Sequence, residues 1–104
     1  MEDPATFIAN DTYAKSAGVE LIEASPGRAW VRMQIETCHF NSHRTVHGGA
    51  IFTLADTAFA IASNTHGIPA AAINATISYV KAARGGTLYA EAEEFACNPK
   101  LATY

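Results

Sequence analysis

The segment from Gly49 to about Asn64 most constrains the fold of this chain, because almost every position in it is apolar. A helix that is apolar on nearly every side has to lie inside a larger structure. The polar exceptions Thr53, Asp56 and Thr57 are spaced i, i+3 and i+4, so a helix places them on one narrow stripe. We therefore expect a central helix here, surrounded by the rest of the chain and carrying a single polar stripe.

Short segments with the period-two alternation of β-strands stand on both sides of this helix. In the clearest one, residues 29–36, small and aliphatic residues alternate with Trp30 and polar residues. Gly85-Gly86 fits the two-residue turn of a hairpin. Strands grouped around one helix favour antiparallel pairing, so the sequence predicts an α+β fold with an antiparallel sheet wrapped around the helix. The expected extended segments are 19–24, 29–36, 70–83 and 88–93, with another strand beginning at 101–104.

Two further segments complete the expected order of elements. Residues 4–17 predict a helix interrupted near Asn10-Asp11, because Asp3-Pro4 is a typical helix start and Gly18 a typical helix end. Residues 37–47 show no sustained period, so we expect a long loop before the central helix.

Composition narrows the class of protein. A length of 104 residues predicts one domain over 1–104, and 49% hydrophobic residues in a domain this small favour an oligomer. A net charge of -3 argues against a nucleic-acid partner. No apolar run reaches the roughly 18 residues of a membrane span. The acidic start Met1-Glu2-Asp3-Pro4 and a content of only two cysteines indicate a soluble, cytoplasmic protein.

Asp56 is the candidate catalytic residue of the predicted helix. Burying an unpaired carboxylate costs several kcal/mol, and no basic residue stands three or four positions away. A purely structural interpretation, in which the polar stripe faces solvent or a partner subunit, explains Asp56 about equally well when the stripe is considered alone.

His47-Gly48-Gly49, directly before and at the start of the helix, favours the functional interpretation. Backbone N–H groups and the positive end of the helix dipole converge there, and glycines leave room for an acyl oxygen, so the pattern predicts an oxyanion site. From Gly49 to Asp56 a helix rises about 10 Å. A nucleophile and an oxyanion donor must both lie within about 3 Å of one carbonyl group. We therefore expect a site shared between two subunits.

The sequences NSHRTVHGGAIFTLADTAFA at 41–60 and AINATISY at 72–79 resemble the hotdog-fold acyl-CoA thioesterases of the phenylacetate-degradation (PaaI) type. The resemblance implies an antiparallel sheet around one long helix, a homodimer that commonly pairs into a tetramer, and an acyl-CoA substrate with no further cofactor. It also implies a last strand that continues past the position of Tyr104 inside the sheet. We therefore expect either a fragment of a longer product or strands that close up or borrow from a neighbour.

The resemblance also assigns roles to individual residues. Asp56 corresponds to the carboxylate that attacks the thioester or activates water, with the choice between the two left open. Gly49 corresponds to the backbone N–H that polarises the thioester carbonyl. The other implied site residues are Asn41 and His47, which orient substrate or water, Gly48 and Thr57 beside the site, and Arg84 and Lys81 near the phosphates of coenzyme A.

Alternatives to this interpretation remain open. A zinc site is one alternative, with Cys38, His39, His43 and His47 as its candidate ligands. The residues around them are poor helix formers, and no carboxylate or second cysteine completes the ligand set, so we expect no metal. A nucleophilic Cys38 lacks an orienting group. A non-catalytic acyl-CoA-binding or interaction subunit is the main alternative function, and a hotdog hydratase fits less well.

The acyl group itself is expected to be small. Aromatic residues that could line a pocket for a phenylacetyl-type group are Phe40, Phe52, Phe59 and Tyr79, although packing in the core is their more common role.

Overall fold

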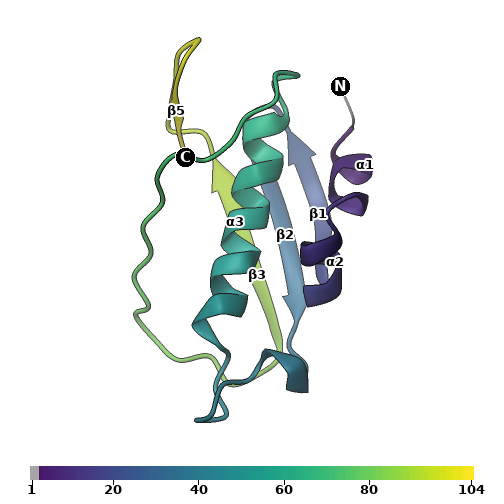
Figure 1. Ribbon diagram of the computed structural model, residues 1–104, viewed down its shortest axis with the longest axis vertical. Coiled ribbons are helices and arrows are strands. Elements are labelled where there is room, and N and C mark those ends of the chain that lie inside the picture. Colours follow the sequence, from purple (N-terminus) through teal and green to yellow (C-terminus); the bar gives the residue numbers. More distant parts are fainter. Residues whose placement is uncertain (1–2) are drawn as a thin grey trace.

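The computed structural model describes residues 3–104, so Met1 and Glu2 of the predicted acidic start lie outside the described residues. The elements follow the expected order, with one predicted strand missing (Figure 1). They are α1 (Pro4–Ala9), α2 (Thr12–Ala17), β1 (Val19–Ser25), β2 (Arg28–Gln34), the 3-10 helix η1 (Thr37–His39), α3 (Gly48–Asn64), β3 (Thr87–Glu93), β4 (Ala96–Cys97) and β5 (Ala102–Thr103).

Side-chain caps explain the interrupted N-terminal helix. The Asp3 carboxylate accepts a hydrogen bond from the Thr6 N–H at 2.8 Å and begins α1, with Pro4 in the first helical position. The Asp11 carboxylate accepts from the Ala14 N–H at 3.0 Å and begins α2 as a separate helix. Gly18 ends α2 with a φ of 87°, a left-handed conformation that glycine adopts without a steric penalty. The predicted interruption near residues 10–11 is confirmed.

The sheet has the order β1-β2-β3, with both neighbouring pairs antiparallel. The central strand β2 alternates strictly between buried and exposed residues. Ala29, Val31 and Met33 are 0% exposed and face α3, whereas Trp30 on the opposite face is 39% exposed. This alternation is the one predicted from the sequence, and it decides which face of the sheet the helix covers.

The long helix α3 packs against this face with one of its own sides (Figure 1). The predicted helix is confirmed, and so is the α+β architecture with an antiparallel sheet. The other side of α3, which includes Asp56, is not covered by the sheet, although the sequence favoured a helix surrounded on all sides. The buried residues of α3 follow the i, i+3, i+4 spacing of one helix face: Leu54, Thr57, Ala58, Ile61 and Ala62.

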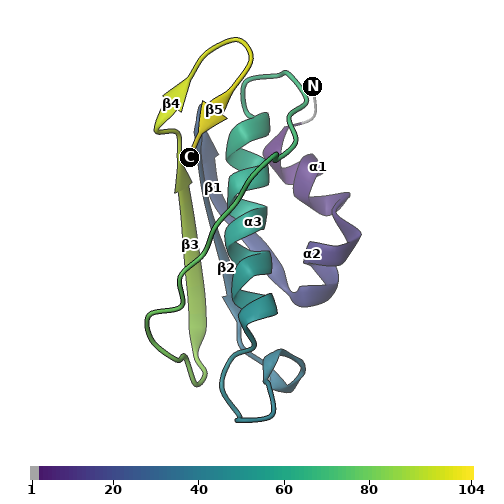
Figure 2. The ribbon, with the colours of Figure 1, turned by 60° about the vertical axis from the view of Figure 1, so that its left-hand side comes forward.

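The predicted strand at 70–83 is not formed. The segment runs past the open side of α3 as an irregular chain (Figure 2), so Gly85-Gly86 closes no hairpin with β3. A strand needs a neighbour for its backbone N–H and C=O groups. The sheet of the described chain ends at β3, and this segment does not join that edge. Its apolar side chains remain exposed, with Ile73 at 84% and Val80 at 94%.

The strand expected to begin at 101–104 is confirmed as part of the small β4–β5 hairpin, with Asn98-Pro99 in the connection between its two strands. The Asn98 N–H donates to the Leu101 carbonyl oxygen at 2.7 Å. This hairpin forms a sheet separate from β1-β2-β3. Within residues 3–104, no helix is both long and apolar enough to cross a membrane.

Candidate active site

The loop before α3 is braced by Asn41. Its side-chain oxygen accepts hydrogen bonds from the His43 N–H at 2.9 Å and the Thr45 N–H at 3.1 Å, and its amide donates to the Thr45 hydroxyl at 2.9 Å. These bonds hold a tight turn in which Arg44 has a positive φ of 60°. Asn41 therefore shapes the approach to the helix N-terminus, and its side chain is engaged within its own loop.

His47 and Gly49, two of the predicted site residues, are in direct contact. The His47 Nδ1 atom accepts a hydrogen bond from the Gly49 N–H at 2.8 Å and so caps α3. This backbone N–H is the predicted oxyanion donor, and in this structure it is already satisfied. A thioester oxygen can bind there only when the imidazole turns aside. Both residues are exposed, so that movement does not disturb the core.

Gly48 contacts Tyr79, a residue that the sequence offered only as a possible pocket wall. The Tyr79 hydroxyl donates to the Gly48 carbonyl oxygen at 3.0 Å. A Cβ atom on Gly48 would lie 3.2 Å from the tyrosine ring, closer than ordinary van der Waals contact. Glycine at this position thus allows the 70–83 segment to approach the start of α3. The contact spans 31 positions of sequence, so no local pattern could have revealed it.

Asp56 lies on the open side of α3, exposed to solvent. Within residues 3–104, no salt bridge or hydrogen bond engages its carboxylate. Thr57, predicted on the same stripe, is instead 4% exposed, and its hydroxyl donates to the Thr53 carbonyl oxygen at 2.7 Å. The predicted stripe is therefore divided, because consecutive residues of a helix point about 100° apart. Asp56 is available for chemistry, whereas the Thr57 hydroxyl is already used by the helix.

Lys81 and Arg84 are exposed near the end of the irregular segment. Neither takes part in a salt bridge with another described residue. The adjacent Ala83 carbonyl accepts a hydrogen bond from the Val46 N–H at 2.8 Å, which places Arg84 beside the loop that leads into α3. Arg84 is thus brought near the predicted site through its backbone, while Lys81 has no such link.

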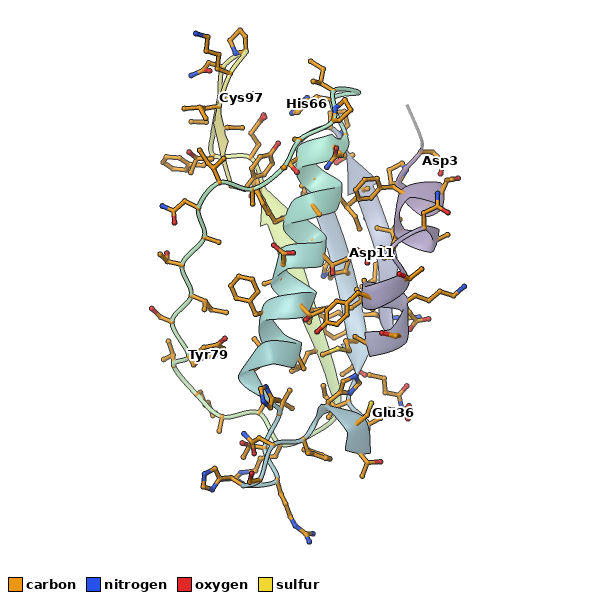
Figure 3. The ribbon with its side chains drawn as sticks, viewed as in Figure 1. Asp3, Asp11, Glu36, His66, Tyr79 and Cys97 are labelled. Carbon is orange, nitrogen blue, oxygen red and sulfur yellow. The ribbon has the colours of Figure 1, made fainter. Side chains whose placement is uncertain are left out.

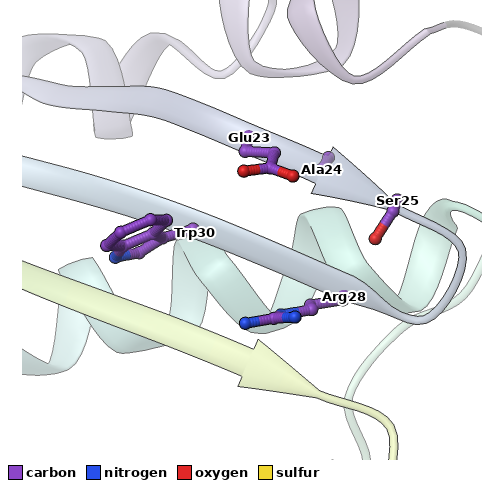
Figure 4. A pocket seen from close by; sticks show the side chains of 5 residues that line it. All are labelled: Glu23, Ala24, Ser25, Arg28 and Trp30. Carbon is purple, nitrogen blue, oxygen red and sulfur yellow. The ribbon is translucent and has the colours of Figure 1, made fainter.

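Two hollows of the single chain lie away from Asp56. One, of about 70 Å³, lies on the outer face of the sheet beside Arg28 and Trp30 (Figure 4). The other, of about 440 Å³, lies between α2, β1 and η1 and is lined in part by Lys15, Glu20 and His39. Neither contains a predicted site residue.

The alternative zinc set Cys38, His39, His43 and His47 is not assembled. His39 is 5% exposed, and both of its ring nitrogens are engaged, one with the Glu36 N–H at 2.9 Å and one with the Ala17 carbonyl oxygen at 2.6 Å. The segment forms a 3-10 turn and a loop, so the helical spacing that suggested a metal site does not exist here.

Comparison with known proteins places this arrangement in a family context. The Thioesterase superfamily model matches residues 43–102, which include Gly49, Asp56 and Arg84. Acyl-coenzyme A thioesterase PaaI of Escherichia coli is 41% identical over 85 residues, covering 81% of this chain and 61% of that protein. The chain therefore spans less than two thirds of the length of this relative.

Solved structures agree with this match. The PaaI protein from the phenylacetic acid degradation operon of E. coli is 37% identical, with a TM-score of 0.87 over 90% of this chain and 69% of that chain. A mutant of the phenylacetic acid degradation protein PaaI from Thermus thermophilus is 34% identical, with a TM-score of 0.83 over 86% of this chain and 78% of that chain. The expected hotdog architecture is confirmed.

Proposed function

Because this chain belongs to the thioesterase superfamily, we propose that it hydrolyses an acyl-CoA thioester to the free acid and coenzyme A, in one domain formed by residues 1–104. The observation that carries the proposal is an exposed carboxylate, Asp56, without a partner in the described chain, on the helix whose first turn is Gly48-Gly49. The 41% identity to an acyl-CoA thioesterase supports the choice of substrate.

Asp56 acts by one of two routes. As a general base, it takes a proton from water while the water oxygen bonds to the thioester carbon, and the C–S bond then breaks. As a nucleophile, its oxygen bonds to that carbon, the thiolate leaves, and water hydrolyses the resulting anhydride. In both routes the thiolate leaves as coenzyme A and takes up a proton. The Gly49 N–H of a second subunit holds the negative charge on the carbonyl oxygen.

His47 has two positions in this mechanism. Without substrate, its imidazole caps Gly49 at 2.8 Å. With substrate, it leaves that N–H to the thioester oxygen and orients the acyl group or the water, together with the Asn41 loop. Gly48 leaves room for the 70–83 segment to approach the start of α3. Thr57 supports the helix turn beside Asp56. Arg84, and Lys81 beside it, attract the phosphates of coenzyme A through long-range charge.

An acyl-CoA panel tests this function directly. We expect release of free thiol, detected with a thiol reagent, from a small acyl-CoA, with aromatic groups such as phenylacetyl among those accepted. The half-buried Phe52 and Phe59, on the same helix as Asp56, support an aromatic group. Since Cys38 and Cys97 are exposed, protein without substrate provides the thiol blank. Absence of turnover with every acyl-CoA tested would contradict the proposal.

A non-catalytic acyl-CoA-binding subunit is the second candidate. The specific observation in its favour is that the Gly49 N–H is already satisfied by His47. Saturable acyl-CoA binding without thiol release is the result expected of such a subunit, so the same panel distinguishes the two functions.

A homodimer, or a tetramer built from dimers, is part of the proposal. The open side of α3, the exposed 70–83 segment and the unpaired edge of β3 support it, because a second chain would cover all three. In sedimentation experiments we expect at least twice the mass of one chain. A cytoplasmic location also belongs to this proposal.

Ser78→Pro tests where the subunits meet. Proline removes a backbone N–H that no described hydrogen bond uses, so the change costs a single chain no hydrogen bond, whereas strand pairing between subunits would lose one. We expect the variant to dissociate at concentrations where the wild type stays associated. Tyr13→Ser, which alters an exposed residue on α2, serves as the control. A stable folded wild-type monomer would contradict the dimer and weaken the shared site.

A further inference from the structure

Three side chains with the chemistry of metal ligands meet beyond the C-terminal end of α3. They come from separate elements, because His66 follows α3, Glu94 follows β3 and Cys97 lies in β4. One imidazole nitrogen, one carboxylate oxygen and the thiol sulfur all lie within 4.8 Å of one another. Figure 3 shows His66 and Cys97 at the end of the molecule opposite Glu36. The cluster is therefore distinct from the candidate active site.

The turn between β1 and β2 holds two of these residues in place. The Gly27 N–H donates to the hydroxyl of Thr65, the neighbour of His66, at 2.7 Å. The Glu94 N–H donates to the Gly27 carbonyl oxygen, also at 2.7 Å. Gly27 has a φ of 74°, and a Cβ atom there would lie only 3.1 Å from the Glu94 side chain. One glycine turn thus anchors the chain at both His66 and Glu94.

The side chains already interact with one another. The His66 Nε2 atom and the Glu94 carboxylate lie 2.8 Å apart. The hydrogen bond from His66 holds the pKa of the Glu94 carboxyl below its usual value. The hydrogen bond between Cys97 and Glu94 raises the pKa of the Cys97 thiol. The Cys97 thiol is exposed and also donates to the Asn98 carbonyl oxygen at 3.6 Å, a partner that it gives up when it binds a cation.

We infer that His66, Glu94 and Cys97 form a binding site for a zinc-type divalent cation, which joins the β4–β5 hairpin to the end of α3. An imidazole, a carboxylate and a thiolate are the ligand types that Zn²⁺ takes in proteins. Tetrahedral Zn²⁺ with bonds of about 2.0–2.3 Å separates its ligand atoms by roughly 3.3–3.8 Å. The His66 and Glu94 atoms, 2.8 Å apart, would separate by about 0.5 Å, and separations of up to 4.8 Å would contract by about 1–1.5 Å.

Charge and exposure also suit this ion. A carboxylate and a thiolate together balance the charge of one Zn²⁺. The side chains of His66 and Glu94 are 37% and 27% exposed, which leaves room for water as the fourth ligand. The ion would supply a constraint that the hairpin lacks, because strands of two residues each provide little stability by themselves.

A structural role follows from the position of the site. Gly49 and Asn64 stand at opposite ends of α3, about 22 Å apart along the helix axis. Asp56, the other half of the shared site, is about 12 Å from Asn64 along the same axis. A cation at His66 is therefore too far from Asp56 and from Gly49 of its own chain to bond the thioester. We expect the bound cation to make the β4–β5 hairpin more ordered and to leave the thioester chemistry unchanged.

Titration of the metal-free chain with Co²⁺ tests the site, because Co²⁺ takes the same ligands as Zn²⁺ and its bond to a thiolate gives a charge-transfer absorption. We expect one Co²⁺ per chain with this absorption, displacement by Zn²⁺, and slower alkylation of Cys97 when Zn²⁺ is bound. Cys97→Ser and His66→Ala should each weaken binding at least about 10²-fold, the upper range for loss of a group that only orients a ligand.

Matched controls come from the chain itself. Cys38→Ser removes the other exposed thiol, and Glu93→Gln alters the exposed neighbour of Glu94, so both should bind Co²⁺ like the wild type. Circular dichroism establishes that each variant is folded, and Cys97 alkylation in the wild type needs no variant at all. The proposal is overturned by a Co²⁺ spectrum without thiolate absorption, by unchanged binding in Cys97→Ser, or by Cys97 alkylation that Zn²⁺ does not slow.

Discussion

Asp56→Asn is expected to lower kcat for acyl-CoA hydrolysis by at least about 10²-fold, the lower range for loss of a general acid–base group. The amide has nearly the same shape as the carboxylate but carries no negative charge, so it can neither take a proton from water nor attack the thioester. The measurement is thiol release at saturating acyl-CoA, with KM determined separately. An unchanged KM together with the lower kcat places the defect in the chemical step.

The position of Asp56 in the structure lets this variant test catalysis separately from stability. Because Asp56 is exposed in the single chain and takes part in no salt bridge of the described residues, its replacement should leave the fold of the chain, followed by circular dichroism, nearly unchanged. Glu23→Gln removes a carboxylate of the same charge from the outer face of the sheet and should keep full activity. Turnover retained in Asp56→Asn would reject the catalytic role and return Asp56 to an ordinary surface position.

Met33→Ala is expected to lower the free energy of unfolding by about 2–5 kcal/mol, the usual cost of truncating a large buried side chain. Met33 is 0% exposed in the centre of β2 and is the largest of the fully buried side chains. The loss combines the hydrophobic transfer energy of the removed atoms with the cavity that they leave between the sheet and α3. Chemical denaturation followed by circular dichroism provides the measurement.

Gln34→Ala is the matched control for this prediction, because Gln34 is the next residue of the same strand and points to the exposed face. We expect a change within about 0.5 kcal/mol, as for most surface substitutions. Both variants must be compared at one protein concentration, since an oligomer gains apparent stability by mass action. Equal effects of the two substitutions would show that α3 does not pack on β2 as described.

Local chemistry explains why so much of this fold could be read from the sequence. The Asp3 and Asp11 caps, the Gly18 helix end and the alternation along β2 depend on residues only a few positions apart. Such signals act before distant parts of the chain meet. They also place Gly49 and Asp56 on one helix, which the structure confirms.

The strand predicted at 70–83 shows where local reasoning ends. Its alternation is typical of a strand, but pairing depends on reaching a sheet edge from a distant part of the chain, and in the described chain this segment does not join the free edge of β3. Likewise, helical periodicity placed Thr57 and Asp56 on one stripe. The side of α3 that packs against the sheet decided that Thr57 is buried and Asp56 exposed.

The candidate sites divide in the same way. The sequence by itself determined the α+β class, the long helix and the motif that carries Asp56 behind His47-Gly48-Gly49, because each depends on spacing along the chain. Only the tertiary structure decided that His47 occupies the Gly49 N–H, that Tyr79 reaches Gly48, and that His66 meets Glu94 across 28 positions. Contacts between distant residues depend on how the helix and the sheet pack against each other. Packing is a property of the whole fold, so short sequence patterns do not predict these contacts.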